Sequence, residues 1–469
     1  MESSSAPTLT SSLRAYMLRR FKISERGSSV STEIFAGVTT YLSLSFVFIL
    51  NPAILGAAQP DRAGIAMSPA SILMATVVTS SLATIAMGIF SNLPLAVGPG
   101  IEVSAFFTYI LVNRMGMTWE EALLAVCVSG ALNIVLTAFS VRQRIVEAIP
   151  KGLKSSLLLA IGVFVLLVGL KLGDVIDVDT RTRWLFLSGP FWSIDRLRQG
   201  PLVLLVGLVF SAVLNIARLR LPWGTLIGIL AGALACHIVG IELPSYQTFG
   251  GDKWYQTVLK LSPAAVFTLP FLSGVIILFV IDFVGGIGKI YALTEDAGIA
   301  RENARGQGLR NALYVDGAAT LLGGLLGTSS LIAFVESRIG IQAGGRTGLA
   351  AIICGCLMLL GGTFSKLLVL VPPPAAAGTL VYVGLLLIGL NGKIVRRESD
   401  RALDRAVAIA MGVSVLLSFQ MDYAMLLGFG TYYCLARKRG ESLQSTSWLG
   451  LVALLLLVTI IPQLILLAK

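Results

Sequence analysis

Charged side chains are scarce in this chain of 469 residues: Asp, Glu, Lys and Arg make up 13% of it, whereas hydrophobic residues make up 55%. A soluble domain has about 25% charged residues. The composition therefore excludes a soluble globular protein. It predicts an all-α polytopic membrane protein whose main environment is the lipid bilayer.

Histidine is also scarce, and so are cysteines at the spacing that metal sites need. This excludes most catalytic and metal chemistry. The one histidine, His237, ends an apolar run, and the five cysteines lie in apolar runs without the spacing of metal ligands. No nucleophile with a base and no metal cluster can be assembled from them. We therefore predict no enzyme, no metal site and no cofactor.

The net charge of +11 could indicate a nucleic-acid partner. The basic residues, however, stand in short loops between apolar runs, so the excess predicts a positive-inside topology and no nucleic acid. We place the N-terminus in the cytoplasm, and the loops 173–198 and 242–268, which carry several acidic residues, outside. The cytoplasmic loops then hold Arg142, Arg144, Lys151, Lys154, Arg218, Arg220, Arg301, Arg305, Arg310, Lys393, Arg396, Arg397, Arg401, Arg437, Lys438 and Arg439.

Apolar runs of about 20 residues, the length that crosses a bilayer as a helix, recur along the chain and predict fourteen transmembrane segments. They lie at 35–57, 69–90, 93–112, 120–140, 152–172, 199–219, 222–241, 269–293, 309–326, 327–345, 347–363, 366–390, 402–420 and 421–437. A further run at 447–468 would either place Lys469 outside or lie along the membrane surface.

Two of these runs are poor helices. The stretch 93–100 has two prolines and two glycines, and 327–345 has four glycines and two charges. Each is the third element of its half when the chain is divided at the loop 242–268, and seven spans per half would invert the second half relative to the first. Interrupted segments at corresponding places in two halves point to the binding site of a secondary transporter.

Glu336, in the second broken segment, is the ionisable residue that best indicates function. A carboxylate at membrane depth costs about 3 kcal/mol on insertion scales, and irregular backbone is tolerated there only where it lines a cavity or is buried in protein. Two roles are open: an ion pair with Arg338 or a neighbouring span, and a contact with substrate or a proton. The broken helix favours the second.

The other ionisable candidates within spans are Glu102, Asp282, Lys289 and Asp316. We interpret Asp316 as a packing residue and leave Asp282 and Glu102 open between function and structure. Asp282 and Lys289 lie seven residues apart, about 10.5 Å along one helix, so each is expected to contact another element. We interpret Lys289 as extending its ammonium group to the cytoplasmic interface.

Half-helices that begin at the two breaks would aim their N-termini at the middle of the membrane, where free N–H groups bind anionic or acceptor-rich atoms. Ser104, Ser329 and Ser330 add hydroxyl groups. A flat polar heterocycle fits between such ends, with Glu336 receiving its ring N–H groups. Phe106, Phe107 and Phe334 are the candidates to stack on the ring, although packing is the more common role of single aromatics in membrane spans.

Short motifs follow one another in a recognisable order: Phe-Ile-Leu-Asn-Pro-Ala-Ile-Leu at 48–55, Leu-Pro-Leu-Ala-Val-Gly-Pro-Gly at 93–100, Ala-Phe-Phe at 105–107, Gly-Thr-Ser at 327–329, Phe-Val-Glu-Ser at 334–337, Gly-Gly-Arg-Thr-Gly-Leu at 344–349 and Val-Pro-Pro-Pro-Ala at 371–375. With these motifs, nearly the whole chain resembles the AzgA-type purine permeases. It is similar to a divergent member of the nucleobase–ascorbate transporter (xanthine/uracil permease) family.

The resemblance implies a UraA-like fold of fourteen segments in two inverted repeats of seven. Short strands are implied in segments 3 and 10, and Glu336 matches the family's binding carboxylate in segment 10. The implied parts are a cytoplasmic tail (1–34), a core domain (35–140 and 269–363), a gate domain (141–241 and 364–437), an extracytoplasmic loop (242–268) and an extra apolar helix (438–469).

The chain departs from the family pattern at the expected site. In segment 8, Asp282 matches the first of two acidic residues, whereas the second, which should face substrate, falls on Gly285. In segment 3, Glu102 and Ser104 replace the usual glycine and asparagine. Either Glu102 compensates for Gly285, or the pocket binds something other than a standard purine.

We therefore predict a secondary active transporter that takes up purine nucleobases (adenine, guanine, hypoxanthine or xanthine) by an elevator-like movement of core against gate. Protons are the expected coupling ion and sodium is less favoured; Asp282, Glu102 and Glu336 are the proton-coupling candidates. The expected substrate contacts are Glu336, Ser104, Ser329, Ser330, Phe334 and Gly285.

The resemblance also implies a homodimer, and the compact loops indicate the cell inner (plasma) membrane. Two alternatives stay open. One is the same fold moving another small heterocycle or an organic anion, and the other is a non-transporting membrane receptor or scaffold.

Overall fold

The computed structural model describes residues 18–139, 151–178, 185–187, 200–216, 224–241, 255–299, 307–362, 371–398, 402–419 and 421–438. Residues 439–469 of the predicted final helix, half of the predicted tail and about half of the predicted loop 242–268 lie outside these residues.

Most of the described chain is helical, because a helix satisfies its own backbone hydrogen bonds in lipid. The helices are α2 (Val30–Leu44), α3 (Val47–Leu55), α4 (Pro69–Ala86), α6 (Trp119–Ala138), α8 (Lys151–Leu172), α10 (Gly200–Ile216), α11 (Gly224–Val239), α12 (Leu269–Asp296), α14 (Gln307–Leu326), α16 (Gly348–Gly361), α18 (Pro373–Glu398), α19 (Ala402–Ser418) and α20 (Met421–Lys438). Shorter elements are η1 (Met87–Ser91), α5 (Ile101–Ala105), η2 (Phe106–Val112), η4 (Pro263–Ala265) and α15 (Ser337–Gln342).

Five of the helical stretches are long and apolar enough to cross a membrane: Val30–Leu55, Pro69–Ser91, Trp119–Ala138, Ser155–Leu172 and Leu269–Asp296. Six shorter apolar helices also occur among the described residues. This confirms a mostly helical membrane protein, whereas the count of fourteen segments and the inverted repeats stay predictions.

Hydroxyl side chains fix where several helices begin. Thr118 and Glu121 form a capping box at the start of α6, and the hydroxyl of Thr268 accepts a hydrogen bond from the Phe271 N–H at the start of α12. Thr347 caps α16 in the same way. Each cap satisfies an N–H group that the first turn of a helix leaves without a partner.

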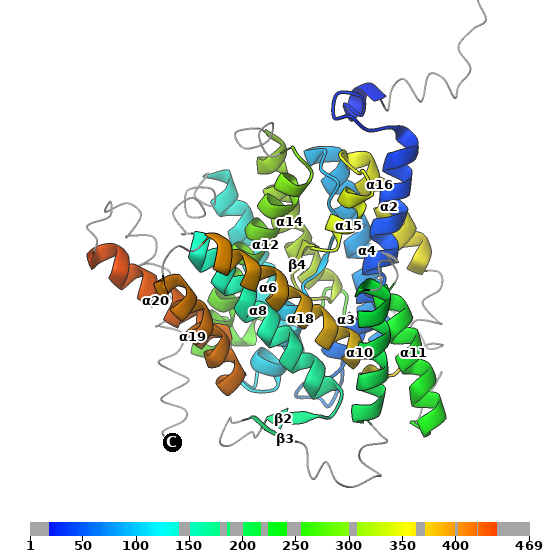
Figure 1. Ribbon diagram of the computed structural model, residues 1–469. Coiled ribbons are helices and arrows are strands. Elements are labelled where there is room, and N and C mark those ends of the chain that lie inside the picture. The colour runs from blue at the N-terminus through cyan, green and yellow to red at the C-terminus, as the bar shows by residue number, and fades with distance from the viewer. Residues whose placement is uncertain are drawn as a thin grey trace, which may run out of the picture.

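The helices pack in two groups. The first group contains α2, α3, α4, α6, α12, α14 and α16 with the short elements between them, and the second contains α8, α10, α11, α18, α19 and α20. Figure 1 shows α10 and α11 on one side of α18, and α19 and α20 on the other. The two groups meet mainly where α5 and α12 contact α8, where α3 contacts α18 and where α2 contacts α11.

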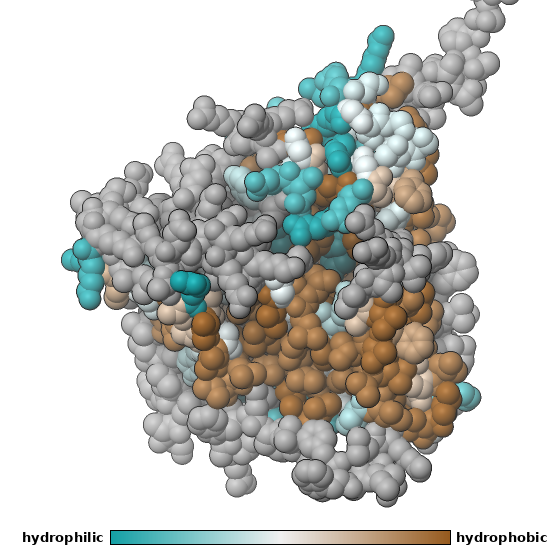
Figure 2. Space-filling view, viewed as in Figure 1, coloured by the Kyte–Doolittle hydropathy of each residue, from teal (hydrophilic) through white to brown (hydrophobic). Residues whose placement is uncertain are grey.

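Figure 2 shows a broad hydrophobic area on the lower part of the face that is turned to the viewer, while hydrophilic residues gather toward the end where α2 begins. The helices α10 and α11 contribute to the exposed apolar surface with Phe210, Leu234 and Ile238, which are 48%, 61% and 75% exposed. Such a continuous apolar surface suits lipid and would aggregate in water.

The two broken segments meet as a small antiparallel sheet. β1 (Val97–Pro99) pairs with β4 (Leu331–Ala333), and Gly98 lies opposite Ile332. The short strands expected in segments 3 and 10 are therefore confirmed. A second hairpin, β2 (Ile176–Val178) with β3 (Leu185–Leu187), lies at the opposite end of the molecule from the start of α2 (Figure 1).

Glycines allow α6 and α14 to approach closely. A Cβ built on Gly324 of α14 would lie 2.6 Å from Cys127 Sγ and 2.7 Å from the Leu123 carbonyl oxygen, both on α6. A Cβ on Gly130 of α6 would meet the Leu321 backbone nitrogen at 2.5 Å. No side chain fits at this contact without separating the two helices.

Replacing Gly324 by Val should lower the melting temperature of the purified protein in detergent, because overpacking a tight contact costs about 1–3 kcal/mol. Gly389→Ala on α18 is the matched control, since a Cβ at Gly389 would meet no described atom within 4 Å. That change should leave the melting temperature equal or raise it. Equal melting of Gly324→Val and wild type would contradict the close packing of α6 on α14.

Candidate functional site

The two broken segments place two half-helices beside the β1–β4 sheet. β1 leads into α5 and η2, which together form the apolar helix Ile101–Val112, and β4 leads into α15, whose N-cap is Glu336. The Ser337 hydroxyl accepts a hydrogen bond from the Ala96 N–H at 3.0 Å. This bond ties the start of α15 to the segment that contains β1.

A buried ion pair joins the first half-helix to α12. Lys289 Nζ donates to Glu102 Oε1 at 2.6 Å, and the two side chains are 9% and 6% exposed. The interpretation that Lys289 extends to the cytoplasmic interface is therefore wrong, because the ammonium group is held inside by Glu102. A buried charge needs such a partner, since an uncompensated one costs several kcal/mol.

Glu336 is half-buried and lies within electrostatic reach of both Lys289 and Glu102. The charges of Lys289 and Glu102 cancel, so the three side chains together carry one excess negative charge when Glu336 is ionised. The sequence alone leaves open an ion pair between Glu336 and Arg338. In the structure, Arg338 instead donates from Nε to Asp296 Oδ2 at 2.6 Å. Within the described residues, Glu336 forms no ion pair.

Open space borders α12 next to this charged group. Gly285 is buried, yet a Cβ built on it would meet no described heavy atom within 4 Å, and the same holds at Gly288. At Gly274 of the same helix, by contrast, a Cβ would meet Leu111 at 2.8 Å. Gly285, Gly288 and Lys289 share one helix face, so the space lies on the face that carries the ammonium group.

Ser104 and Ser329 lie in a hydrogen-bond network centred on Asn51. The Ser104 hydroxyl lies 2.6 Å from Asn51 Oδ1 and 2.6 Å from the Ser329 hydroxyl. Asn51 Nδ2 donates to Thr76 Oγ1 at 2.8 Å and to Thr328 Oγ1 at 2.9 Å. The network joins α3 and α4 to both broken segments, and its hydroxyl groups are fully buried.

Asp282 and Ser330 belong to a second buried network. Asp282 Oδ2 accepts from Asn133 Nδ2 at 2.9 Å and from Thr320 Oγ1 at 3.1 Å. The Thr320 hydroxyl also lies 2.9 Å from the Ser330 hydroxyl. As expected from their spacing, Asp282 and Lys289 contact different elements, α6 and α14 for Asp282 and α5 for Lys289.

Phe334 follows β4 and packs against β1. Its side chain is 6% exposed, and its ring occupies the place that a Cβ on Gly98 would take. The missing side chain of Gly98 therefore makes room for the ring. Asp316 is fully buried on α14, which places it among packed residues.

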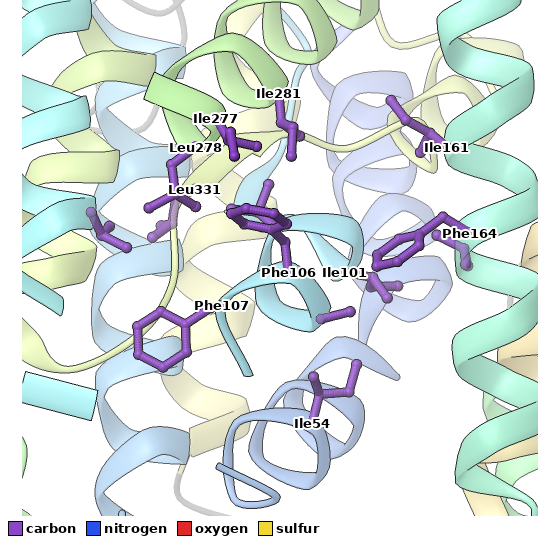
Figure 3. Packing of buried hydrophobic residues seen from close by; sticks show 14 of the residues in the cluster. Ile54, Ile101, Phe106, Phe107, Ile161, Phe164, Ile277, Leu278, Ile281 and Leu331 are labelled. Carbon is purple, nitrogen blue, oxygen red and sulfur yellow. The ribbon is translucent and has the colours of Figure 1, made fainter. Parts of the chain in front are cut away.

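Apolar side chains close around the half-helices. Figure 3 shows Phe106 pointing toward Ile277 and Ile281 of α12, and Phe164 of α8 facing Ile101 at the start of α5. All five belong to one buried cluster. Such surroundings exclude water and strengthen the electrostatic interactions of the nearby charges.

The site offers hydrogen-bonding groups of opposite kind. An ionised carboxylate such as Glu336 only accepts hydrogen bonds, and an ammonium group such as Lys289 only donates them. Among the described residues, no group of three His, Cys, Asp or Glu side chains could hold a metal ion. The arrangement therefore suits binding of a small polar molecule through its own N–H and acceptor atoms.

Lys289 and Asn51 are the site residues that sequence reasoning did not select. Asn51 stands in an otherwise apolar helix followed by Pro52, a signal that could have identified it. Lys289 is visible in the sequence as an ionisable residue, but its pairing with Glu102 joins residues 187 positions apart. No local pattern predicts such a contact.

Comparisons with known proteins agree with this architecture. A family model for xanthine/uracil permeases, described as a permease family, matches residues 31–422. The chain is 31% identical to the adenine permease AdeQ of Escherichia coli over 88% of this chain and 89% of that protein. It is 29% identical to the guanine/hypoxanthine permease PbuG of Bacillus subtilis over 88% of this chain and 92% of that one.

A likeness to a solved structure supports the fold alone. The murine anion transporter Slc26a9 in its inward-facing state matches 94% of this chain and 73% of its own, with a TM-score of 0.64 and 13% identity. A mostly helical transporter fold is therefore shared across very different sequences.

The buried ion pair makes a prediction about stability. Lys289→Met alone should lower the free energy of unfolding by about 3–5 kcal/mol, because it leaves the Glu102 carboxylate buried without its partner. Lys289→Met combined with Glu102→Gln should recover most of that loss. Denaturant or thermal unfolding of the single and double variants measures the difference.

Lys22→Met is the control, because the pair of Lys22 with Glu25 is 52% and 70% exposed and such pairs contribute at most about 1 kcal/mol. A double variant whose loss equals the sum of the two single losses would show that Lys289 and Glu102 do not interact.

Proposed function

Because the chain belongs to the xanthine/uracil permease family, the nucleobase–ascorbate transporters, we propose that it is a secondary active transporter that takes up purine nucleobases together with protons. The relatives named above are permeases for adenine and for guanine and hypoxanthine, and the matched residues cover most of this chain. Family membership also makes the protein a permease rather than an enzyme.

The observation that carries the proposal is the position of Glu336. Its carboxylate stands at the start of a half-helix next to the β1–β4 sheet, within electrostatic reach of Lys289 and Glu102. In our proposal, Glu336 accepts the ring N–H groups of the base while Lys289 donates to a ring nitrogen or exocyclic oxygen. The space at Gly285 and Gly288 admits the ring.

The remaining proposed contacts have two kinds of support. Phe334 lies directly after β4 and next to Gly98, close enough to the sheet to stack on a bound ring. Ser104, Ser329 and Ser330 are fully buried and hold the two broken segments together, so their proposed contribution is to fix the shape of the pocket and to offer hydroxyl groups at its wall.

Among the three proton-coupling candidates, Glu336 has the strongest support. Glu102 is neutralised by Lys289, and Asp282 accepts hydrogen bonds from Asn133 and Thr320. A proton on Glu336 would remove the one excess negative charge of the site, and an uncompensated charge is costly inside the membrane. We therefore prefer protons to sodium as the coupling ion.

The proposed movement is that of a core domain against a gate domain, with the boundaries predicted from the sequence. The two helix groups each have extensive internal contacts and meet over a smaller area. Where they meet, Ile101 and Phe164 belong to an apolar cluster, and contacts between apolar side chains are non-directional, which favours sliding of one group past the other. We further propose a homodimer in the cell inner membrane with a cytoplasmic N-terminus.

A second candidate, transport of another small heterocycle or an organic anion by the same fold, is favoured by one observation. The pocket holds the ammonium group of Lys289 next to Gly285, where the family places an acid, and a cation there would attract an anion. Competition of unlabelled organic anions against a bound purine distinguishes this candidate.

Glu336→Gln should weaken purine binding and abolish its dependence on protons, because the amide keeps the shape of the side chain but has one acceptor oxygen instead of two and cannot take up a proton. A purine at 100 times its dissociation constant should stabilise the wild type by about 2.7 kcal/mol, measurable as a rise in melting temperature. Glu295→Gln, an exposed change at the end of α12, should keep that rise. If purine raises the melting temperature of Glu336→Gln as much as that of the wild type, Glu336 does not contact the purine.

Uptake into proteoliposomes should follow an inward proton gradient. With one proton per base, a difference of one pH unit supports about a tenfold accumulation, a protonophore should abolish it, and removal of sodium should not. The folded fraction of the Asp282→Asn protein should still accumulate purine in response to the proton gradient. If Asp282→Asn exchanges purines but no longer accumulates them in response to the proton gradient, Asp282 and not Glu336 carries the coupling proton.

A further inference from the structure

A groove of about 410 Å³ lies on the outer side of the first helix group, between α4 with η1 on one wall and α14 on the other. Apolar side chains line most of it, among them Leu82, Phe90 and Leu322, which are 50%, 63% and 40% exposed. In a membrane-spanning chain, such a surface faces the acyl chains of the bilayer.

The groove has the length of one membrane leaflet. Leu82 and Phe90 are eight residues apart, or about 12 Å along a helix, and the hydrocarbon of one leaflet is about 15 Å deep. On the opposite wall, Tyr314, Ala318 and Leu322 succeed one another at intervals of four residues and form one stripe. A single extended acyl chain matches this length and this apolar lining.

Two arginines stand at one end of the groove. Arg20 donates to the Ile89 carbonyl oxygen at 2.9 Å, and Arg310 lies over the ring of Tyr314 and within 3.4 Å of its hydroxyl. Both are exposed, and neither forms an ion pair with a carboxylate in the described part of the chain. Their positive charge therefore has no counter-charge from these protein residues.

The π-helical turn η1 explains why this end of the groove is polar. A π-turn widens the helix, and the carbonyl oxygens of Ile89 and Phe90 are contacted by Arg20 and by Asn311 Nδ2, the latter at 2.7 Å. Asn92, in the left-handed region at φ 52°, then ends the helix. The turn thus anchors one guanidinium group at the place where the apolar lining stops.

We propose that this groove binds an anionic phospholipid, with one acyl chain between α4 and α14 and the phosphate between Arg20 and Arg310. The cations stand at one end only and the rest of the lining is apolar, which complements a ligand with an anionic head and an apolar tail. Basic pockets between membrane helices bind lipid headgroups by this combination of charge and burial. The site is separate from the proposed nucleobase site and does not depend on it.

The test compares phosphatidylglycerol with phosphatidylcholine of the same acyl chains, added to the purified full chain in detergent. Native mass spectrometry counts bound lipid, and the melting temperature reports the effect. Phosphatidylglycerol should bind at lower concentration, and each arginine removed should weaken it about fivefold. The double variant Arg20→Gln with Arg310→Gln should therefore show no preference between the two lipids.

Two further variants separate the head and tail of the site. Ala318→Phe fills the groove and should abolish the phosphatidylglycerol binding while both arginines remain. Arg437→Gln is the control, since Arg437 donates to the hydroxyl of Tyr433, four residues before it on α20, and its replacement should leave lipid binding unchanged. Equal binding of both lipids by the wild type would overturn the proposal, and so would an unchanged preference in the double arginine variant. A change of oligomeric state in Ala318→Phe without a change of bound lipid would also overturn it.

Discussion

The pairing of β1 with β4 is the constraint on which the site depends. Two stretches leave the helical path inside the membrane, and each unpaired backbone N–H or C=O there would cost several kcal/mol. Neither stretch can satisfy its own groups, so each satisfies the other's, with Gly100 N–H donating to Ser330 and Phe334 N–H to Ala96 beyond the ladder itself. This pairing brings the two halves of the chain together and places Glu102 and Glu336, which directly follow the strands, in one neighbourhood.

So short a sheet is not stable alone, since even a longer two-stranded ribbon is marginal in water. Two buried hydrogen-bond networks support the sheet. In the first, Asn51 binds Ser104, which also contacts Ser329. In the second, Thr320 contacts both Ser330 and Asp282. Buried hydrogen-bond networks of this kind restrict the positions of the groups that they join. A rigid pair of strands keeps the half-helices aimed at one point, which a binding site for a small flat molecule requires.

The sequence pattern predicts some of these features but cannot predict others, and the difference has a physical reason. Prolines and glycines at 93–100 and glycines at 327–345 revealed both breaks, because those residues act on the local backbone. Helical spacing was enough to exclude a contact between Asp282 and Lys289. The partner of Lys289, however, comes from a distant segment, and its choice depends on how α12 packs against α5, so a snorkelling lysine and a buried one look alike in sequence. The same holds for Asn51, whose polar side chain is visible but whose partners are not.

The charge of the site links the departures from the family pattern to each other. If the acid that the resemblance implies for this part of α12 stood at Gly285, it would share the proposed pocket with Glu336, and two like charges there would need two protons or a cation. Here Gly285 leaves space, and the added carboxylate, Glu102, arrives together with Lys289, so the pair adds no net charge. One proton on Glu336 is then enough to make the three side chains neutral. A neutral group crosses the low-dielectric interior at the smallest cost, which agrees with our proposal that a neutral base is taken up together with a single proton.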